Sequence, residues 1–302
     1  MSHSHSHNHS HDHHHYDDVK NIKVAFFLNL GFTLIEIAGG FFTNSIAILS
    51  DAVHDLGDSL SLGLAWYFQK LSQKGSDKHF SYGYKRFSLL GAFINSFVLL
   101  VGSVLIITVS VSRLFEPQEP KADWMILLAI VGVIVNGAAV FRLKKGDSLN
   151  EKVVSLHLLE DVLGWAAILV GSIVMYFVDI PILDPLMSLS ISVFILYNVF
   201  RNMKQGFHII LQGIPDEIDL AKITNLIKST DKIENVHDLH IWSIDGNLNI
   251  LTAHIVLDKE YNMKEIAILK DIIREKLAEE GIKHATLEFE NKNEDCSYEK
   301  CC

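Results

Sequence analysis

Cysteine is scarce in this chain of 302 residues. There are three cysteines, Cys296, Cys301 and Cys302, and all lie within the last seven residues. A reducing cytosol disfavours a disulfide framework. The cluster indicates either a soft metal site or free surface thiols, and both interpretations stay open.

The first twenty residues lack the apolar core of a cleavable signal peptide, so we expect none. Residues 1–18 are instead a polar tract dominated by His and Ser. This composition predicts a disordered tail that binds borderline metals such as zinc, nickel or copper weakly. The other interpretation is a purification tag, although tags are usually unbroken His runs.

Charge is unevenly distributed along the chain. Residues 213–302 hold 19 acidic and 11 basic residues and are therefore acidic. The whole chain is nevertheless 49% hydrophobic, so its apolar residues concentrate before this region. Six apolar stretches precede this acidic region: 24–42, 46–68, 87–112, 124–141, 153–178 and 182–200. Each approaches the ~20 residues that a helix needs to cross ~30 Å of hydrocarbon. Because helices satisfy their own backbone groups in lipid, residues 19–212 are predicted to form a six-helix transmembrane domain.

Basic residues predict the orientation of these helices. They follow the second, fourth and sixth stretches, as Lys70, Lys74, Lys78, Lys85, Arg86, Arg142, Lys144, Lys145, Lys152, Arg201 and Lys204. The opposite loops offer only Arg113 and Lys121. Lys and Arg concentrate in cytoplasmic loops, so both termini are expected in the cytosol.

Beyond Gln212 the hydrophobic periodicity changes. Residues 216–229 and 263–279 have helical periodicity, and VHDLHIWSI, LNILTAHIVL and HATLEFE read as strands, the first two joined by a short turn at 245–247. The order αββαβ predicts a small two-layer α+β domain over residues 213–291. Residues 292–302 form the cysteine-containing tail.

An unusual set of polar residues lies within the second apolar stretch. Asp51, His54, Asp55 and Asp58 are spaced by helical turns and so share one helix face. A charge at the bilayer centre costs ~2.5–3.5 kcal/mol, so such a stripe indicates function. For Asp51, close to the start of the stretch, a structural role at the outer interface or in a hydrogen bond to a neighbouring helix stays equally open. By contrast, Asn29 and Glu36 in the first stretch fit hydrogen bonding between helices.

The fifth stretch repeats the pattern. His157 and Asp161 are four residues apart, as are His54 and Asp58. Two imidazoles and two carboxylates match the tetrahedral preference of Zn²⁺. If the helices begin and end with these apolar stretches, His54 and His157 lie at different depths. The four side chains would converge only if the fifth helix began earlier than residue 153.

Several motifs resemble those of the cation diffusion facilitators, the family of bacterial zinc, cadmium and cobalt exporters and of eukaryotic zinc transporters. They are TNSIAILSDAVHDLGDSLSL at 43–62, YGYKRFSLLGAFINS at 82–96, HLLED at 157–161, DPLMSLSI at 184–191 and HDLHIW at 237–242. The resemblance spans about residues 20–290. It implies a homodimer whose subunits have six transmembrane helices and a ferredoxin-like cytoplasmic domain, and which exports divalent metal in exchange for protons.

The resemblance also implies roles for individual residues. His54, Asp58, His157 and Asp161 would form the transport site, and a histidine at position 54 resembles the zinc-preferring arrangement. His237, His254 and Glu290 match positions of a regulatory cytoplasmic metal site, and His240 is an additional candidate. Two departures from the family pattern are Ile266–Ala267, which puts a two-metal cluster in doubt, and Tyr84, which disfavours a loop site with Asp77 and His79.

Two other functional classes fit less well. An intramembrane metallohydrolase would need an open metal position and a general base, as in HExxH, and the sequence has no HExxH motif. A metal sensor would not explain paired HxxxD motifs in two membrane helices. We therefore expect a transporter rather than an enzyme, in a bacterial inner membrane, whose partners are lipid, protons, divalent ions and a second copy, with no nucleic acid. Whether Cd²⁺ or Co²⁺ is also carried stays open.

Overall fold

The structure is a computed structural model that describes residues 12–72, 74–143 and 149–292. The side chains of some helical residues, mainly 12–25 and 149–158, lie outside this description. Contacts divide the chain into two compact units. The helical unit comprises Met1–Lys70 and Gly91–Asn202, and the C-terminal unit comprises Leu71–Leu90 and Met203–Cys302.

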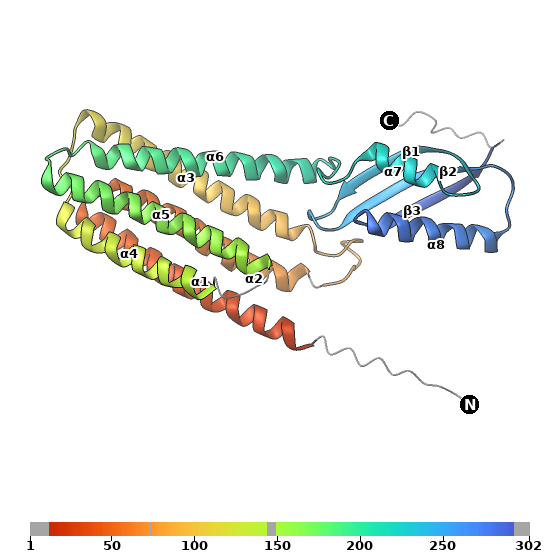
Figure 1. Ribbon diagram of the computed structural model, residues 1–302, viewed down its shortest axis with the longest axis horizontal. Helices are drawn as coiled ribbons and strands as arrows, with labels where there is room; N and C mark the ends of the chain where they lie inside the picture. The colour runs from red at the N-terminus through yellow and green to blue at the C-terminus, as the bar shows by residue number, and fades with distance from the viewer. Residues whose placement is uncertain (1–11, 73, 144–148, 293–302) are drawn as a thin grey trace. The chain divides into compact units, whose positions relative to one another are not determined.

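Six long helices account for most of the chain before residue 211 (Figure 1). They are α1 (Asp12–Thr43), α2 (Ile46–Ser72), α3 (Phe87–Phe115), α4 (Ala122–Leu143), α5 (Leu149–Phe177) and α6 (Leu183–Ile210). Among the described residues, four segments are long and apolar enough to cross a membrane: Phe26–Thr43, Phe87–Phe115, Leu159–Phe177 and Leu183–Ile210. In α4 the apolar segment is shorter, Ala122–Ala138. In α2 three aspartates interrupt it.

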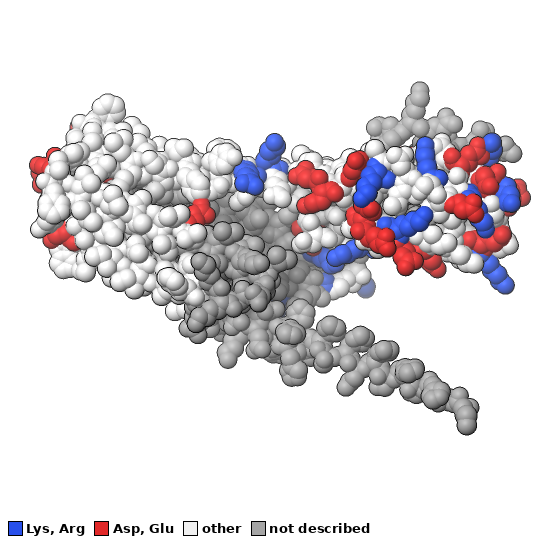
Figure 2. Space-filling model, viewed as in Figure 1, with Lys and Arg blue, Asp and Glu red and all other residues white. Residues whose placement is uncertain are grey.

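The outer surface of the helical unit is strongly apolar. Large side chains such as Phe97 and Val170, each 63% exposed, point away from the helix contacts. Few charged side chains occur on the face of this unit that Figure 2 shows, whereas the C-terminal unit carries many of both signs. Apolar surface of this extent needs a hydrocarbon environment, so this is an integral membrane protein.

Two helix starts differ from the sequence prediction. Helix α1 begins at Asp12, so residues 12–18 belong to a helix rather than to the predicted disordered tail. Extending an existing helix by a turn or two costs little, because only nucleation is unfavourable. Helix α5 begins at Leu149, four residues before the predicted start. An earlier start is what the convergence of the four predicted ligands requires.

The C-terminal unit confirms the predicted order αββαβ. Its elements are α7 (Leu220–Lys228), β1 (Ile233–Ser243), β2 (Asn249–Leu257), α8 (Met263–Glu279) and β3 (Ile282–Asn291). Strands β1 and β2 pair antiparallel, and β2 and β3 pair parallel through the α8 crossover. Helix α7 is shorter than predicted because Asp219 caps it, accepting hydrogen bonds from the amides of Ala221 and Lys222.

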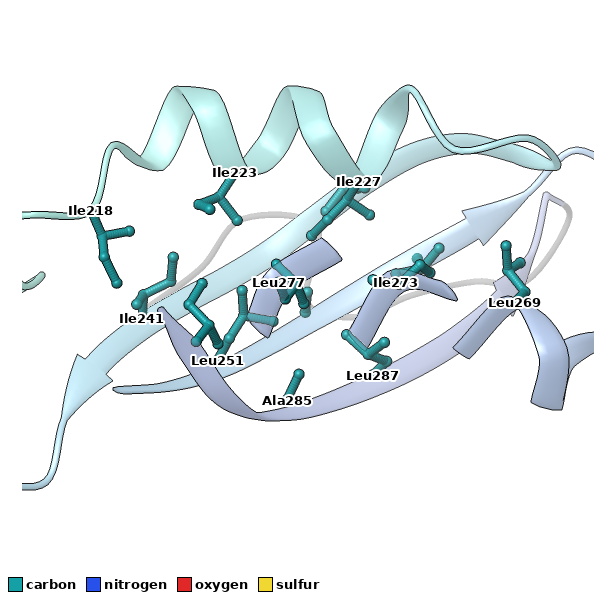
Figure 3. Close-up of a cluster of buried hydrophobic side chains, with 14 of the residues drawn as sticks. Ile218, Ile223, Ile227, Ile241, Leu251, Leu269, Ile273, Leu277, Ala285 and Leu287 are labelled. Atoms are coloured by element: carbon teal, nitrogen blue, oxygen red, sulfur yellow. The ribbon is translucent and has the colours of Figure 1, made fainter. Parts of the chain in front are cut away.

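Both α7 and α8 cover one face of this sheet (Figure 3). Each buries a stripe at helical spacing: Ile223 and Ile227 on α7, and Leu269, Ile273 and Leu277 on α8. Facing them, β2 buries every second residue: Leu251, Ala253, Ile255 and Leu257. The residues between these therefore lie on the opposite face, which is where the candidate ligands of this unit occur.

Adjacent isoleucines on α8 allow a matched test of this core. Ile273 is fully buried, whereas Ile272 is 42% exposed. We expect Ile273→Ala to lower the free energy of unfolding of the C-terminal unit by about 2–5 kcal/mol, and Ile272→Ala by less than about 1 kcal/mol. Hydrogen exchange of β2 amides in the full-length protein measures both. Equal effects of the two substitutions would contradict this packing.

Candidate metal centres

In the helical unit, α2 and α5 bring three predicted ligands together. His54 and Asp58 of α2 and Asp161 of α5 offer ligand atoms that all lie within 4.8 Å of one another. The Nε2 atom of His54 is 3.7 Å from an Asp58 oxygen and 3.8 Å from an Asp161 oxygen. Two ligands bound to a tetrahedral Zn²⁺ at about 2.0–2.1 Å are separated by about 3.4 Å. Small side-chain movements therefore suffice for shared coordination.

The fourth predicted ligand lies on α5, one turn before Asp161. The backbone of His157 is helical, but its side chain lies outside the described residues. Its role as a ligand remains a prediction.

Close helix packing positions α5. Trp165, four residues after Asp161, is 1% exposed and packs against Gly132 of α4. A Cβ atom on Gly132 would lie only 2.2 Å from the Trp165 ring, so this contact requires glycine. A Cβ on the neighbouring Gly164 would lie 3.5 Å from an Asp51 carboxylate oxygen, which is an ordinary contact distance.

Further acidic groups surround the three ligands. Asp51 and Asp55 of α2 and Glu36 of α1 are at most 5% exposed, and electrostatic interactions connect them. Asn29 of α1 donates hydrogen bonds to the Asp55 carbonyl and to the Ser59 hydroxyl, both at 3.1 Å. This confirms the predicted role of Asn29 between helices. Glu36, Asp51 and Asp55 thus add three buried carboxyl groups beside the three candidate ligands.

A contact that the sequence did not predict holds the start of α2. The carboxylate of Asp184, on α6, accepts hydrogen bonds from the Ser45 hydroxyl (2.5 Å) and from the amides of Ile46 (2.8 Å) and Ala47 (3.2 Å). It therefore caps the helix that carries His54. The DPLMSLSI motif marks this aspartate, but nothing in the motif identifies its partner.

In the C-terminal unit, a second group combines one residue from each strand. The ligand atoms of His237 (β1), His254 (β2) and Glu290 (β3) lie within 4.8 Å of one another. Glu290 lies between the two rings, with one oxygen 2.9 Å from His237 Nε2 and the other against His254 Nδ1. These side chains are 16%, 14% and 8% exposed. Two nitrogens and a carboxylate form a suitable set for Zn²⁺.

His240 does not join this group directly. Its Nε2 atom is 3.0 Å from a carboxylate oxygen of Asp238, a residue that the sequence analysis did not consider. The HDLH motif contains both Asp238 and His240. Their contact could not be predicted from the motif, because it depends on the irregular pairing of β1 with β2.

The loop after α2 holds no metal group among the described residues. The Asp77 carboxylate accepts hydrogen bonds from the Tyr84 hydroxyl (2.7 Å) and from the amides of His79 and Phe80. These bonds, chiefly that from Tyr84, lower the pKa of Asp77, and the same bond raises the pKa of Tyr84. Asp77 thus stabilises the loop. Cys296, Cys301 and Cys302 lie outside the described residues.

Comparison with known proteins assigns the sequence to a family. Residues 22–211 match the family described as "Cation efflux transmembrane domain", and residues 215–291 match "Cation efflux protein, cytoplasmic domain". The chain belongs to the cation efflux family. It is accordingly a cation transporter and not an enzyme.

Relatives in this family align over most of their length. A "Cadmium, cobalt and zinc/H(+)-K(+) antiporter" of Bacillus subtilis is 34% identical over 90% of this chain and 89% of its own. "Metal cation efflux system protein CzcD" of Cupriavidus metallidurans is 31% identical over 90% and 86%. "Zinc transporter ZitB" of Yersinia pseudotuberculosis is 32% identical over 90% and 87%.

Proposed function

We propose that this protein exports Zn²⁺ from the bacterial cytoplasm in exchange for protons, by alternating access to a site formed by His54, Asp58, His157 and Asp161. The convergence of His54, Asp58 and Asp161 from two helices carries the proposal. The two carboxylates carry the negative charge that attracts a divalent ion, and the imidazole adds a neutral nitrogen ligand. With the ring of His157, the set would be tetrahedral and suited to Zn²⁺.

The same ligands provide the coupling. An imidazole nitrogen or carboxylate oxygen that holds a proton cannot bind metal, so the two cations compete for the same atoms. The site would load Zn²⁺ from the cytosol, open outward, release the metal as protons arrive, and return protonated. His54 contributes a nitrogen where a carboxylate would favour harder ions, which supports zinc as the preferred substrate.

We further propose that all six helices α1–α6 span the membrane and that both termini are cytoplasmic, on the basis of the Lys and Arg distribution. The aspartates that interrupt the apolar stretch of α2 would then lie inside the bundle. The match of residues 215–291 to the family's cytoplasmic domain supports a homodimer. In it, His237, His254 and Glu290 would bind regulatory Zn²⁺.

A broader metal range is a second candidate function. The names of the Bacillus subtilis and Yersinia pseudotuberculosis relatives differ in range, the former including cadmium and cobalt and the latter zinc alone. Competition of Cd²⁺ and Co²⁺ with Zn²⁺ in the transport assay distinguishes the two.

Proteoliposomes that contain the purified protein test the exchange. One pH unit across the membrane supplies about 1.4 kcal/mol per proton. With the lumen more acidic, the steady-state lumenal Zn²⁺ level should therefore rise about tenfold per pH unit for each proton exchanged. A zinc dye and a pH dye inside the vesicles report both ions. Zinc transport that persisted unchanged without a pH gradient and without proton counterflow would refute the exchange.

A further inference from the structure

Hydrogen bonds from α3 and from the segment that joins α3 to α4 hold the turn between α1 and α2. Asn44 occupies this turn with a left-handed φ of +57°, which asparagine tolerates better than most residues. Two nitrogens of Arg113, near the end of α3, donate to the Asn44 carbonyl oxygen at 2.6 Å and to its side-chain oxygen at 2.8 Å. The side-chain amide of Asn44 donates to Gln118 at 3.3 Å, and the amide of Lys121 donates to the Thr43 carbonyl at 2.8 Å.

Buried serines join α2, α3 and α6 inward of this turn. The Ser110 hydroxyl of α3 donates to the Ser188 hydroxyl of α6 at 3.0 Å. The hydroxyls of Ser50, on α2, and Ser192, on α6, also lie 3.0 Å apart. All four side chains are at most 1% exposed. Because Ser50 is one helical turn before His54, these contacts lie along α2 between the turn and the candidate metal site.

We propose that Arg113 is the latch of the outer gate: its paired bonds to Asn44 hold the α1–α2 turn against α3, and they open when metal leaves outward. The inference rests on the proposed alternating-access exporter, because it names a contact that closes one of its two states. In the proposed topology, the connections after α1, α3 and α5 all lie on the outer side. The serine contacts and Arg113 stand between His54 and that side.

Charge makes the arginine contact the decisive one. A hydrogen bond from a guanidinium is roughly twice as strong as one between neutral groups, and two parallel bonds also fix the orientation. The serine pairs are neutral, and water can replace each partner when helices separate. Arg113 also lies close enough to Asp184, the cap of α2, for their charges to attract. Loss of the guanidinium therefore favours opening more than loss of a single serine hydroxyl.

A purely structural role for Arg113 makes a different prediction. The arginine would then stabilise the left-handed turn equally in both states of the bundle. Its removal would lower the thermal stability without changing how often the outer end opens. A latch exists only in the closed state, so its removal shifts the balance between the two states.

Thiol labelling from the outer side distinguishes these roles. Ser50→Cys introduces a single cysteine into a chain in which Cys296, Cys301 and Cys302 are replaced by serine. In right-side-out membrane vesicles, a membrane-impermeant maleimide reaches this thiol only through the outer end. The labelling rate, measured without added zinc, reports how often that end opens.

Arg113→Ala should raise the labelling rate at least about tenfold, because a hydrogen bond to a charged group contributes enough to shift a two-state population by that factor. Arg113→Lys keeps the charge but loses the paired geometry, so its rate should be intermediate. The matched control is Ser112→Ala. Ser112 is exposed, its hydroxyl bonds to the Thr108 carbonyl of its own helix at 3.1 Å, and its loss should leave the rate unchanged. An unchanged rate in Arg113→Ala overturns the inference, whether or not its thermal stability falls.

A cross-link tests the latch in the opposite direction. Asn44→Cys and Arg113→Cys are combined in the same cysteine-free background, without Ser50→Cys. A short bis-thiosulfonate reagent then ties the turn to α3 through reducible disulfides. Zinc uptake into proteoliposomes should stop on cross-linking and recover on reduction. Normal uptake by fully cross-linked protein overturns the inference, even if Arg113→Ala does not fold.

The labelling assay needs neither zinc nor a pH gradient. Faster labelling of Arg113→Ala in a protein that showed no zinc–proton exchange would support the latch and refute the exporter. Zinc–proton exchange with unchanged labelling would refute the latch alone, so the two proposals fail separately.

Discussion

Asp161→Ala is expected to reduce Zn²⁺ transport by more than about 100-fold, because removing a direct ligand costs more than the 10- to 100-fold typical of groups that only orient ligands. Asp161 contributes the one described ligand from α5, and its side chain is 10% exposed, 3.8 Å from His54. Without it, His54 and Asp58 of α2 would face an ion from one side only. Initial rates of zinc uptake into proteoliposomes measure the effect.

Two companion variants separate ligand loss from misfolding. Asp161→Asn keeps the shape of the side chain and removes its charge, so it should also lose most transport while the protein elutes normally in size-exclusion chromatography. Asp179→Asn changes an exposed aspartate just beyond the end of α5 and should transport at the normal rate. Near-normal uptake by Asp161→Ala would remove the basis for a site shared between α2 and α5.

Asp184→Ala is expected to destabilise the helical unit by about 2–5 kcal/mol, because it removes a helix cap and leaves two buried amides unpaired. Those amides belong to Ile46 and Ala47, both at most 1% exposed. Because these residues are buried, water cannot replace the carboxylate. Thermal unfolding in detergent should show a transition lowered by several degrees.

Ser190→Ala is the matched control for Asp184. Ser190 is exposed on the same helix, and its hydroxyl bonds only to the Leu186 carbonyl one turn earlier among the contacts described. It should unfold like the unmodified protein. Asp184→Asn keeps one acceptor oxygen and should fall between the two. Equal transition temperatures for all variants would show that the cap contributes little.

Local pattern predicted much of this molecule. The 3.6-residue periodicity of residues 263–279 matches α8 residue for residue, because its stripe and its capping Asn262 are both local signals. The strands followed from period-two alternation, and Asp245–Gly246 marked the hairpin turn. The His54 and Asp58 pair could be recognised because residues four apart share a helix face.

Long-range contacts account for what was missed. Asp184 and Ile46 are 138 residues apart, and no local pattern connects an acid on one helix to the first turn of another. The contacts of Asp238 could not be predicted, because they depend on a shifted strand pairing, which reverses the faces that simple alternation assigns. The start of α1 at Asp12 does not follow from composition, because composition describes a segment in isolation, whereas a neighbouring helix can extend into it.

The three ligands of the C-terminal group come from three different strands, one each from β1, β2 and β3. An ion held there would cross-link the sheet perpendicular to its strands, and unfolding would have to release it. At a free zinc concentration 100 times the dissociation constant, this linkage adds about 2.7 kcal/mol to the stability of the folded form. The rigidity of this small domain would then rise and fall with the metal content of the cell.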